Sequence, residues 1–386
     1  MFLQNLFKTL RLKNPPKPQR CNLSLTQKLF LSSKAEPTPG DANARSQTAS
    51  YLVSALGLSP ESALASTRWF PAVNPKEAAK AVGALEELGF TQSQIASFVL
   101  KFPRALSPVS LKTILPKIEF LRSRGASSAE VASIVSRCPR ILDRSLERHI
   151  VPTFEMISRF MESDSQAIVI LMRCAGIWYF GTMSVFATNC QALAAAGVPD
   201  NVVRCMLRRQ PNCLLTARGK FDSALEKVKS IGIDPLKNKF VMSLSVLINL
   251  ADSTWKRKVS MFGRWGWSEE DTLRAFERYP NCMLLSEKKL GETMEFFVNE
   301  MGLEPSYFIT NPILLSLSFK NRIVPRCLVV RALISKKLVQ RFSPTTALMT
   351  SNTYFVEKFL SPYSAEHPSL LLLYQEKLGE VENVSR

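Results

Sequence analysis

A short phrase built around proline recurs along the chain and constrains its fold more than any other feature. It reads "KFPRALS" from Lys101, "RCPRILD" from Arg137, "RQPNCLL" from Arg209 and "RYPNCML" from Arg278. Proline disfavours helical geometry in the residue before it, so each phrase is expected to end a helix. The apolar residues that follow are expected to turn inward. Because the phrase returns at similar intervals, the sequence predicts a repeated structural unit.

The positions of these prolines set the repeat length. The markers are Pro71, Pro103, Pro139, Pro211, Pro280 and Pro312, at intervals of 32, 36, 72, 69 and 32 residues. Two intervals are doubled, so we expect copies without the proline near positions 175 and 246, where "RCAGIWY" and "SLSVLINL" stand. The chain of 386 residues is therefore expected to contain about eight repeats of 32–36 residues, two of them distorted.

The residues between two markers predict a pair of helices. The first has one apolar face, formed by Ile114, Leu115, Ile118 and Leu121. Gly125 is expected to end it, because glycine adopts the left-handed closing conformation at little cost, and Ser127 or Ser128 to cap the next helix. The second helix is expected to bury three apolar residues, Val131, Ile134 and Val135.

Neither helix of such a unit can bury its apolar face alone, so neighbouring repeats must stack on one another. The predicted fold class is therefore all-α: a curved α-solenoid of helix–turn–helix repeats, each with a short proline-initiated turn. A second proline follows the marker by 13 residues in three copies, and Pro152 is expected in the first turn of its helix, where a missing N–H costs nothing.

The N-terminus differs in composition from the rest of the chain. Residues 1–35 contain seven basic residues and no acidic one, with Phe and Leu at helical spacing beside Lys8 and Arg11. This pattern is typical of an organellar transit peptide, with a disordered basic tail as the alternative. We expect a linker at 36–47, the repeats at 48–340 and a C-terminal helical cap and tail at 341–386.

The composition argues against catalysis and metal binding. The eight cysteines form no CxxC pair and are expected to be reduced core residues, and the two histidines lie in unrelated surroundings. The sequence shows no glycine-rich phosphate loop, nucleophile elbow or metal-ligand spacing. We therefore expect a binding protein rather than an enzyme, without cofactor, metal ion or small-molecule substrate.

The repeat resembles the mitochondrial transcription termination factor (mTERF) family, in its plant organellar branch. The matching features are the recurrent "xPxxL" phrase, the helix "LPKIEFLRSRG", the opening "TASYLVSALGLSPESAL" and the ending "FVEKFLSPYSAEHPSLLLLYQEK", which together span residues 48–376. The resemblance implies a curved α-solenoid whose basic face binds organellar nucleic acid. It also implies a role in transcription termination or initiation, or in intron splicing and RNA maturation.

A basic residue stands two positions before most markers. It should recur along one edge of the stacked repeats, where a row of cations suits a phosphate backbone. Thr310 breaks the row, and arginines directly after two prolines extend it. The candidate nucleic-acid-binding residues are Lys101, Arg104, Arg137, Arg140, Arg173, Arg209 and Arg278. The alternative is that basic residues near helix C-termini only complement the helix dipole.

Three other features have structural alternatives. Trp255, Trp265 and Trp267 can stack on bases but suit core positions equally well, and the basic run "WKRK" ending at Lys258 is expected to be a solvated face. The uncharged stretch from Cys174 to Pro199 fits buried repeat helices rather than a membrane span.

Charge favours a polyanionic partner. The net charge of +18 falls to +11 without residues 1–35, which leaves 43 basic and 32 acidic side chains. We expect an organellar protein that binds DNA or structured RNA and regulates gene expression, with other organelle gene-expression proteins as further partners. The alternative is a protein-interaction scaffold. The Phe/Leu and Arg/Lys pattern of the first 13 residues favours the mitochondrion over the chloroplast.

Overall fold

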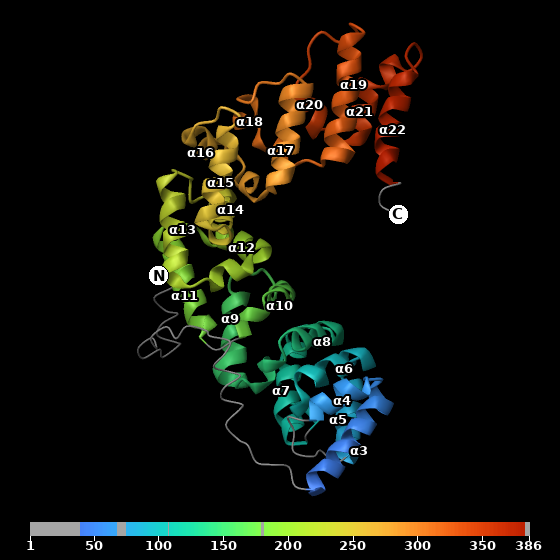
Figure 1. Cartoon of the computed structure of the whole chain (residues 1–386). Coiled ribbons are helices and arrows are strands. Elements are labelled where there is room, and N and C mark those ends of the chain that lie inside the picture. The colour runs from blue at the N-terminus through green and yellow to red at the C-terminus, as the bar shows by residue number, and fades with distance from the viewer. Residues whose placement is uncertain (1–38, 68–74, 107, 179–180, 383–386) are drawn as a thin grey trace. The chain divides into compact units, whose positions relative to one another are not determined.

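Helices account for all the regular structure in the described residues. The computed structural model describes residues 39–67, 75–106, 108–178 and 181–382, and no strand occurs in these ranges (Figure 1). The predicted all-α class is thus confirmed. The expected transit peptide at 1–35 lies outside the described residues. The expected linker at 36–47 is helical from Pro39, because proline suits a first helical position and the Ala-, Arg- and Gln-containing residues after it favour helix.

The helices form two compact units, and the first ends at Arg218. Its α-helices are α3 (Pro39–Leu56), α4 (Pro60–Thr67), α5 (Pro75–Glu87), α6 (Gln92–Lys101), α7 (Pro108–Ser123), α8 (Ser128–Arg137), α9 (Val151–Ser158), α10 (Asp164–Arg173), α11 (Thr182–Ala195) and α12 (Asp200–Arg209). From α5 onward they alternate between the first and second helix of a repeat. Second helices of neighbouring repeats pack together, as α6 does on α8 and α8 on α10.

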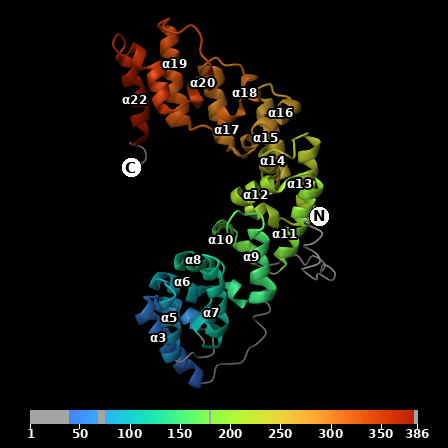
Figure 2. The ribbon, with the colours of Figure 1, turned by 180° about the vertical axis from the view of Figure 1, so that it is seen from behind.

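The second unit begins at Gly219, within α13. Its α-helices are α13 (Arg218–Ser230), α14 (Asn238–Asn249), α15 (Asp252–Gly263), α16 (Glu269–Arg278), α17 (Glu287–Glu295), α18 (Tyr307–Thr310), α19 (Val324–Ser335), α20 (Pro344–Met349), α21 (Asn352–Phe359) and α22 (Ser369–Glu382). Figure 1 shows α19, α21 and α22 side by side, and Figure 2 shows α19 beside α22 from behind. A hydrophobic cluster that includes Leu333, Phe355 and Tyr374 joins them.

The turn that closes the first helix marks the repeats more regularly than the proline does. A residue in the left-handed conformation stands there at Gly57, Gly89, Gly125, Gly197, Gly232, Gly266, Gly302 and Lys337. The doubled interval between 125 and 197 contains the α9–α10 repeat, which turns at Phe160 and Met161. The closing turns therefore number nine within the described residues: one before each of the eight predicted marker positions, and a ninth at Lys337.

The repeat formed by α7 and α8 has the predicted anatomy. Gly125 (φ +90°) follows α7, and the next N–H, from Ala126, bonds the Leu121 carbonyl at 3.1 Å. Ser127 is the N-cap of α8, in a capping box with Glu130. Six of the seven predicted core residues are buried, namely Ile114, Ile118, Leu121, Val131, Ile134 and Val135, and Leu115 is half-buried.

In the described residues, each proline phrase and the equivalent phrase at Ala175 form a 3-10 turn after the second helix, while the Pro71 phrase lies outside these residues. These turns are η1 (Pro103–Leu106), η2 (Pro139–Asp143), η4 (Ala175–Trp178), η5 (Pro211–Leu215), η6 (Pro280–Leu284) and η8 (Pro312–Ser316). Of the two repeats expected to be distorted, the one at 175 is regular, because alanine tolerates the same turn. The one near 246 has no such turn, and α14 continues to Asn249.

Pro152 lies in the first turn of α9, as predicted. A π-helical turn, η3 (Leu146–Ile150), precedes α9 and is continuous with it. The Val151 N–H bonds the Leu146 carbonyl in this wider turn. Since proline lacks an N–H and its ring crowds the carbonyl four residues earlier, the widened turn lets the helix start before the proline. The same arrangement, η9 (Phe319–Ile323), precedes Pro325.

Candidate nucleic-acid interface

The predicted row of basic residues occupies one equivalent structural position. Each member is the last residue of a second helix: Lys101 in α6, Arg137 in α8, Arg173 in α10, Arg209 in α12 and Arg278 in α16. The next residue breaks the helix, and the 3-10 turn follows. This position lies among the last, unpaired carbonyl groups of the helix, where a positive charge is favourable.

Two members of the row bind the backbone of the next repeat. The Arg137 Nη1 donates to the Met172 carbonyl at 3.0 Å, and the Arg173 Nη1 donates to the Arg208 carbonyl at 2.6 Å. Each acceptor lies one residue before the next member of the row. These guanidinium groups therefore pair a carbonyl at the end of the neighbouring second helix and complement its dipole. We call these two residues the inter-repeat arginines.

Two other members have no such partner. Arg209 and Arg278 are exposed, and within the described part of the chain neither makes a hydrogen bond or an ion pair. Arg208 beside Arg209 is exposed as well. We call Arg209 and Arg278 the open arginines, because their guanidinium groups keep all their donors for a ligand.

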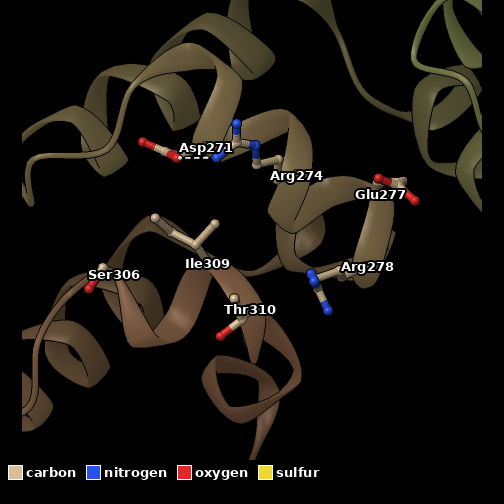
Figure 3. Close-up of a pocket in the computed structure, with 7 residues that line it drawn as sticks. All are labelled: Asp271, Arg274, Glu277, Arg278, Ser306, Ile309 and Thr310. Carbon is tan, nitrogen blue, oxygen red and sulfur yellow. Dashed lines mark ion pairs between the residues drawn. The ribbon is translucent and has the colours of Figure 1, made fainter.

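Arg278 borders a hollow between α16 and the α18 segment (Figure 3). The hollow has a volume of about 510 Å³, and its lining includes Arg274, Glu277 and Thr310. Arg274 is already paired, with Glu270 at 2.7 Å and more distantly with Asp271. The next second helix, α18, has a single turn, and within the described residues no hydrogen bond joins its end to Arg278. Because the lining contains both acidic and basic side chains, the hollow alone does not indicate that it binds an anion.

For the remaining predicted site residues, the structure describes only the position of the backbone. Lys101 ends α6, and Arg104 and Arg140 lie in the turns η1 and η2, but the structure does not describe their side chains. Their contribution to a binding surface stays a prediction.

A second set of polar side chains, missed by sequence reasoning, joins the helices to the turns. The buried Lys117 Nζ donates to the Leu142 carbonyl, and the Asn189 amide nitrogen donates to the Leu214 and Thr216 carbonyls at 3.0 and 2.8 Å. Burial lowers the pKa of the Lys117 amine, against the opposing effect of Asp143. The role of this set is structural, since it pairs carbonyls that the 3-10 turns leave without partners.

Lys258 belongs to the same set, and this corrects the interpretation of "WKRK" as a solvated face. Its side chain is buried at 3% exposure and its Nζ donates to the Leu285 carbonyl. Arg257 pairs with Glu287 at 3.0 Å, which leaves Lys256 as the exposed cation of the run without an ion pair. Lys258 is buried because it shares the face of α15 that holds Trp255 and Phe262.

Two of the three candidate tryptophans are core residues. Trp255 meets Phe276 edge to face, with ring centroids 5.2 Å apart. Trp267 stacks on Phe262 at 4.4 Å and donates from Nε1 to the Pro305 carbonyl at 3.1 Å. Both are 6% exposed, so neither presents a face to a base. Trp265 is half-buried.

The thiols are core groups, as predicted. Six of the seven cysteines in the described residues are buried, and Cys205 is half-buried. Burial raises the pKa of Cys174, Cys282 and Cys327 to about 12, so these groups are neutral thiols at physiological pH. No described group of three or more His, Cys, Asp or Glu residues is arranged to hold a metal ion.

The uncharged stretch around position 190 forms an ordinary repeat helix. Residues Thr182–Ala195 make up α11, which buries Phe186, Leu193 and the hydrogen-bonded Asn189. Among the described helices, none has the length and apolarity needed to cross a membrane.

Comparison with known protein families identifies a match that spans most of the repeats. The mTERF family model matches residues 82–185 and 181–356. The matched segments begin in α5 and end in α21, and they contain every member of the basic row. No curated protein matches the chain.

Proposed function

Because the chain belongs to the mTERF family, we propose that it binds organellar nucleic acid and regulates organelle gene expression through phosphate contacts. Proteins of this family are helical-repeat proteins of organelles that bind nucleic acid. One observation supports the proposal for this chain in particular: Arg209 and Arg278 are exposed at equivalent helix ends and have no protein partner in the described residues.

The position of the open arginines suits a phosphate backbone. Planar guanidinium groups bind phosphate oxygens in pairs and keep their charge at every physiological pH. Contacts of this kind position a protein on nucleic acid without reading its sequence. We therefore assign Arg209 and Arg278 to direct phosphate binding. Arg137 and Arg173 keep exposed side chains, so their unused N–H groups add to the positive edge while Nη1 holds the next repeat.

The proposed role is termination or initiation of transcription, or splicing and maturation of organellar RNA. The proposed location is the mitochondrion, with the chloroplast as the alternative, and the basic segment 1–35 as the targeting signal. Import of a fluorescent protein fused to residues 1–35 into isolated mitochondria and chloroplasts tests the location. Import into neither organelle would overturn this assignment.

One observation favours a second candidate function. Two of the basic residues in the row are used inside the protein, so recurrent charge at this position does not by itself require a nucleic acid. A protein-interaction scaffold for organelle gene expression accounts for that part of the row equally well. It gives no role to the open arginines.

Binding across a salt series separates the two functions. The protein from residue 36 onward would be titrated with labelled organellar DNA and RNA at increasing salt concentration. Phosphate binding predicts affinity that falls steeply with salt, by a slope of about 0.9 per contact on duplex DNA. Weak binding at low salt, together with a stable protein partner recovered from organelle extracts, would support the scaffold instead.

A further inference from the structure

The longest acid-free part of the described chain lies near its C-terminus. Residues 305–356 contain no Asp or Glu. The same segment contains seven basic residues: Lys320, Arg322, Arg326, Arg331, Lys336, Lys337 and Arg341. It therefore carries +7 of a net charge of +18, in a small fraction of the sequence. A surface built from this segment attracts anions through its net charge as well as through single contacts.

Two of these cations already have partners within the protein. Arg326 is fully buried and donates to the Ala347 and Thr350 carbonyls. Arg331 lies 3.9 Å from Glu300. The other cations lie at the two ends of the η9–α19 helix: Lys320 and Arg322 in η9, and the remaining three after α19.

The loop that connects α19 to α20 presents three cations from a fixed backbone. Lys336, Lys337 and Arg341 are exposed, as is Gln340 between them. The intervening apolar residues Leu338, Val339 and Phe342 pack against the C-terminal hydrophobic cluster. The loop is thus anchored by its apolar residues, while its cations face solvent. We call Lys336, Lys337 and Arg341 the basic loop.

Lys337 holds a conformation that glycine occupies in most of the other closing turns. Its φ is +59°, and it is the one non-glycine residue with positive φ in the described chain. The Leu338 N–H bonds the Leu333 carbonyl at 3.0 Å, as Ala126 bonds Leu121 in the α7–α8 repeat. A side chain in the left-handed conformation is strained, so glycine would close this turn more stably. Strain of this kind is found at functional positions.

We propose that the basic loop is a second phosphate-binding site, at the opposite end of the first helix from the proline turns. It rests on the proposed function, because the ligand is the sugar-phosphate backbone of the same nucleic acid. Two lysines and an arginine supply charge, and Gln340 supplies a neutral donor beside them. The loop needs no rearrangement to bind, since its apolar residues already fix the backbone.

The test compares three variants of the protein from residue 36 onward on one duplex DNA and one structured RNA. The first is Lys336→Ala/Lys337→Gly/Arg341→Ala. The second is Lys337→Gly alone, which keeps the turn and removes one charge. The control is Lys80→Ala/Lys220→Ala/Lys256→Ala, which removes three exposed lysines from helices elsewhere. The readouts are the salt dependence of binding, helical circular dichroism and Tm.

We expect the triple loop variant to lower the salt slope by about 2 to 3 on duplex DNA, at unchanged circular dichroism. Lys337→Gly should lower it by about 1 while raising Tm. The control should change the slope by less than the loop variant does. Equal slopes for the wild type and the triple loop variant would overturn the inference while leaving the proposed function intact.

Two further outcomes would each overturn the inference for a different reason. If the wild type binds neither nucleic acid at any salt concentration, the proposed function fails and the basic loop fails with it. If the loop variant keeps nucleic-acid binding but loses wild-type binding to phosphatidylserine vesicles, the loop binds an anionic membrane surface and the inference is wrong. Vesicles of phosphatidylcholine alone are the reference for that measurement.

Discussion

The Nη1 of Arg137, the last residue of α8, donates to the carbonyl of Met172 at 3.0 Å, one repeat further along the chain. Arg173 repeats this relationship with Arg208 at 2.6 Å. Both acceptors lie in the last turn of the next second helix, among carbonyls that have no partner within that helix. The basic row is therefore heterogeneous. Some of its members hold neighbouring repeats together, while Arg209 and Arg278 remain open.

Stability should distinguish the two kinds of arginine. Arg137→Ala and Arg173→Ala each remove a hydrogen bond between repeats, so each should lower the free energy of unfolding by about 0.5–1.5 kcal/mol. Arg209→Ala and Arg278→Ala should change it by less than about 0.5 kcal/mol, as exposed positions without partners usually do. Urea denaturation followed by circular dichroism measures all four. Equal losses at the four positions would contradict the distinction.

Arg326 should be far more sensitive than any surface arginine. It is buried without a carboxylate, its Nη2 donates to Asn352 Oδ1 at 2.6 Å, and its guanidinium lies over the Phe355 ring at 4.7 Å. Arg326→Ala leaves a cavity and unpaired carbonyls, so we expect a loss of about 3 kcal/mol or more in the free energy of unfolding.

Arg326→Lys is the informative companion, since it keeps the charge but cannot reproduce the fork of donors. It should also destabilise the C-terminal cap. A loss below about 1 kcal/mol for Arg326→Ala would mean that the cap does not depend on this residue.

Two closing glycines should differ in their tolerance of alanine. Both Gly89 (φ +85°) and Gly125 (φ +90°) are strained by any side chain. A Cβ on Gly89 would also lie 2.6 Å from the Ser128 Cβ in the next repeat, whereas nothing lies within 4 Å of one on Gly125. Gly89→Ala should therefore lower Tm further than Gly125→Ala. The reverse order would show that these repeats are not packed as described.

Much of this fold follows from local residues. The prolines, Gly125 and Ser127 act through their own backbone preferences, so their roles could be predicted from the sequence. The burial of Lys258 was also predictable, since it lies three residues after Trp255 and four before Phe262 on one helical face.

Whether a residue of the basic row bonds the next repeat or stays open depends instead on contacts between repeats. Arg137 and Arg209 stand in similar phrases, yet only the first bonds a carbonyl of the next second helix. The acceptor is about one repeat away in sequence, and its distance depends on how two helices stack. The strained conformation of Lys337 could not be predicted from its local sequence either. The turn that it closes is recognisable only from the positions of the glycines in other repeats.

Protonation of His149 should lower the stability of the folded protein at acidic pH. Burial lowers the pKa of this imidazole below its usual value, with a smaller contribution from Arg144, although the hydrogen bond to the Trp178 carbonyl opposes the shift. The unfolded chain then binds the proton more readily than the folded one. The stability of the wild type should therefore fall as pH drops below about 6.5.

Replacement of His149 by a group that does not titrate isolates this effect. His149→Gln should show a flatter dependence of the free energy of unfolding on pH between about 6.5 and 5. Urea denaturation at several pH values gives both curves. Parallel curves for the wild type and the variant would exclude His149 as the cause.

The most direct test of phosphate binding by the row compares Arg209→Ala/Arg278→Ala with the wild type on one duplex DNA across a salt series. If the open arginines contact phosphates, the double variant should lower the slope of log affinity against log salt concentration by about 2, with Tm unchanged. The same slope and affinity in both proteins would contradict the account, because the row would then have no part in binding nucleic acid.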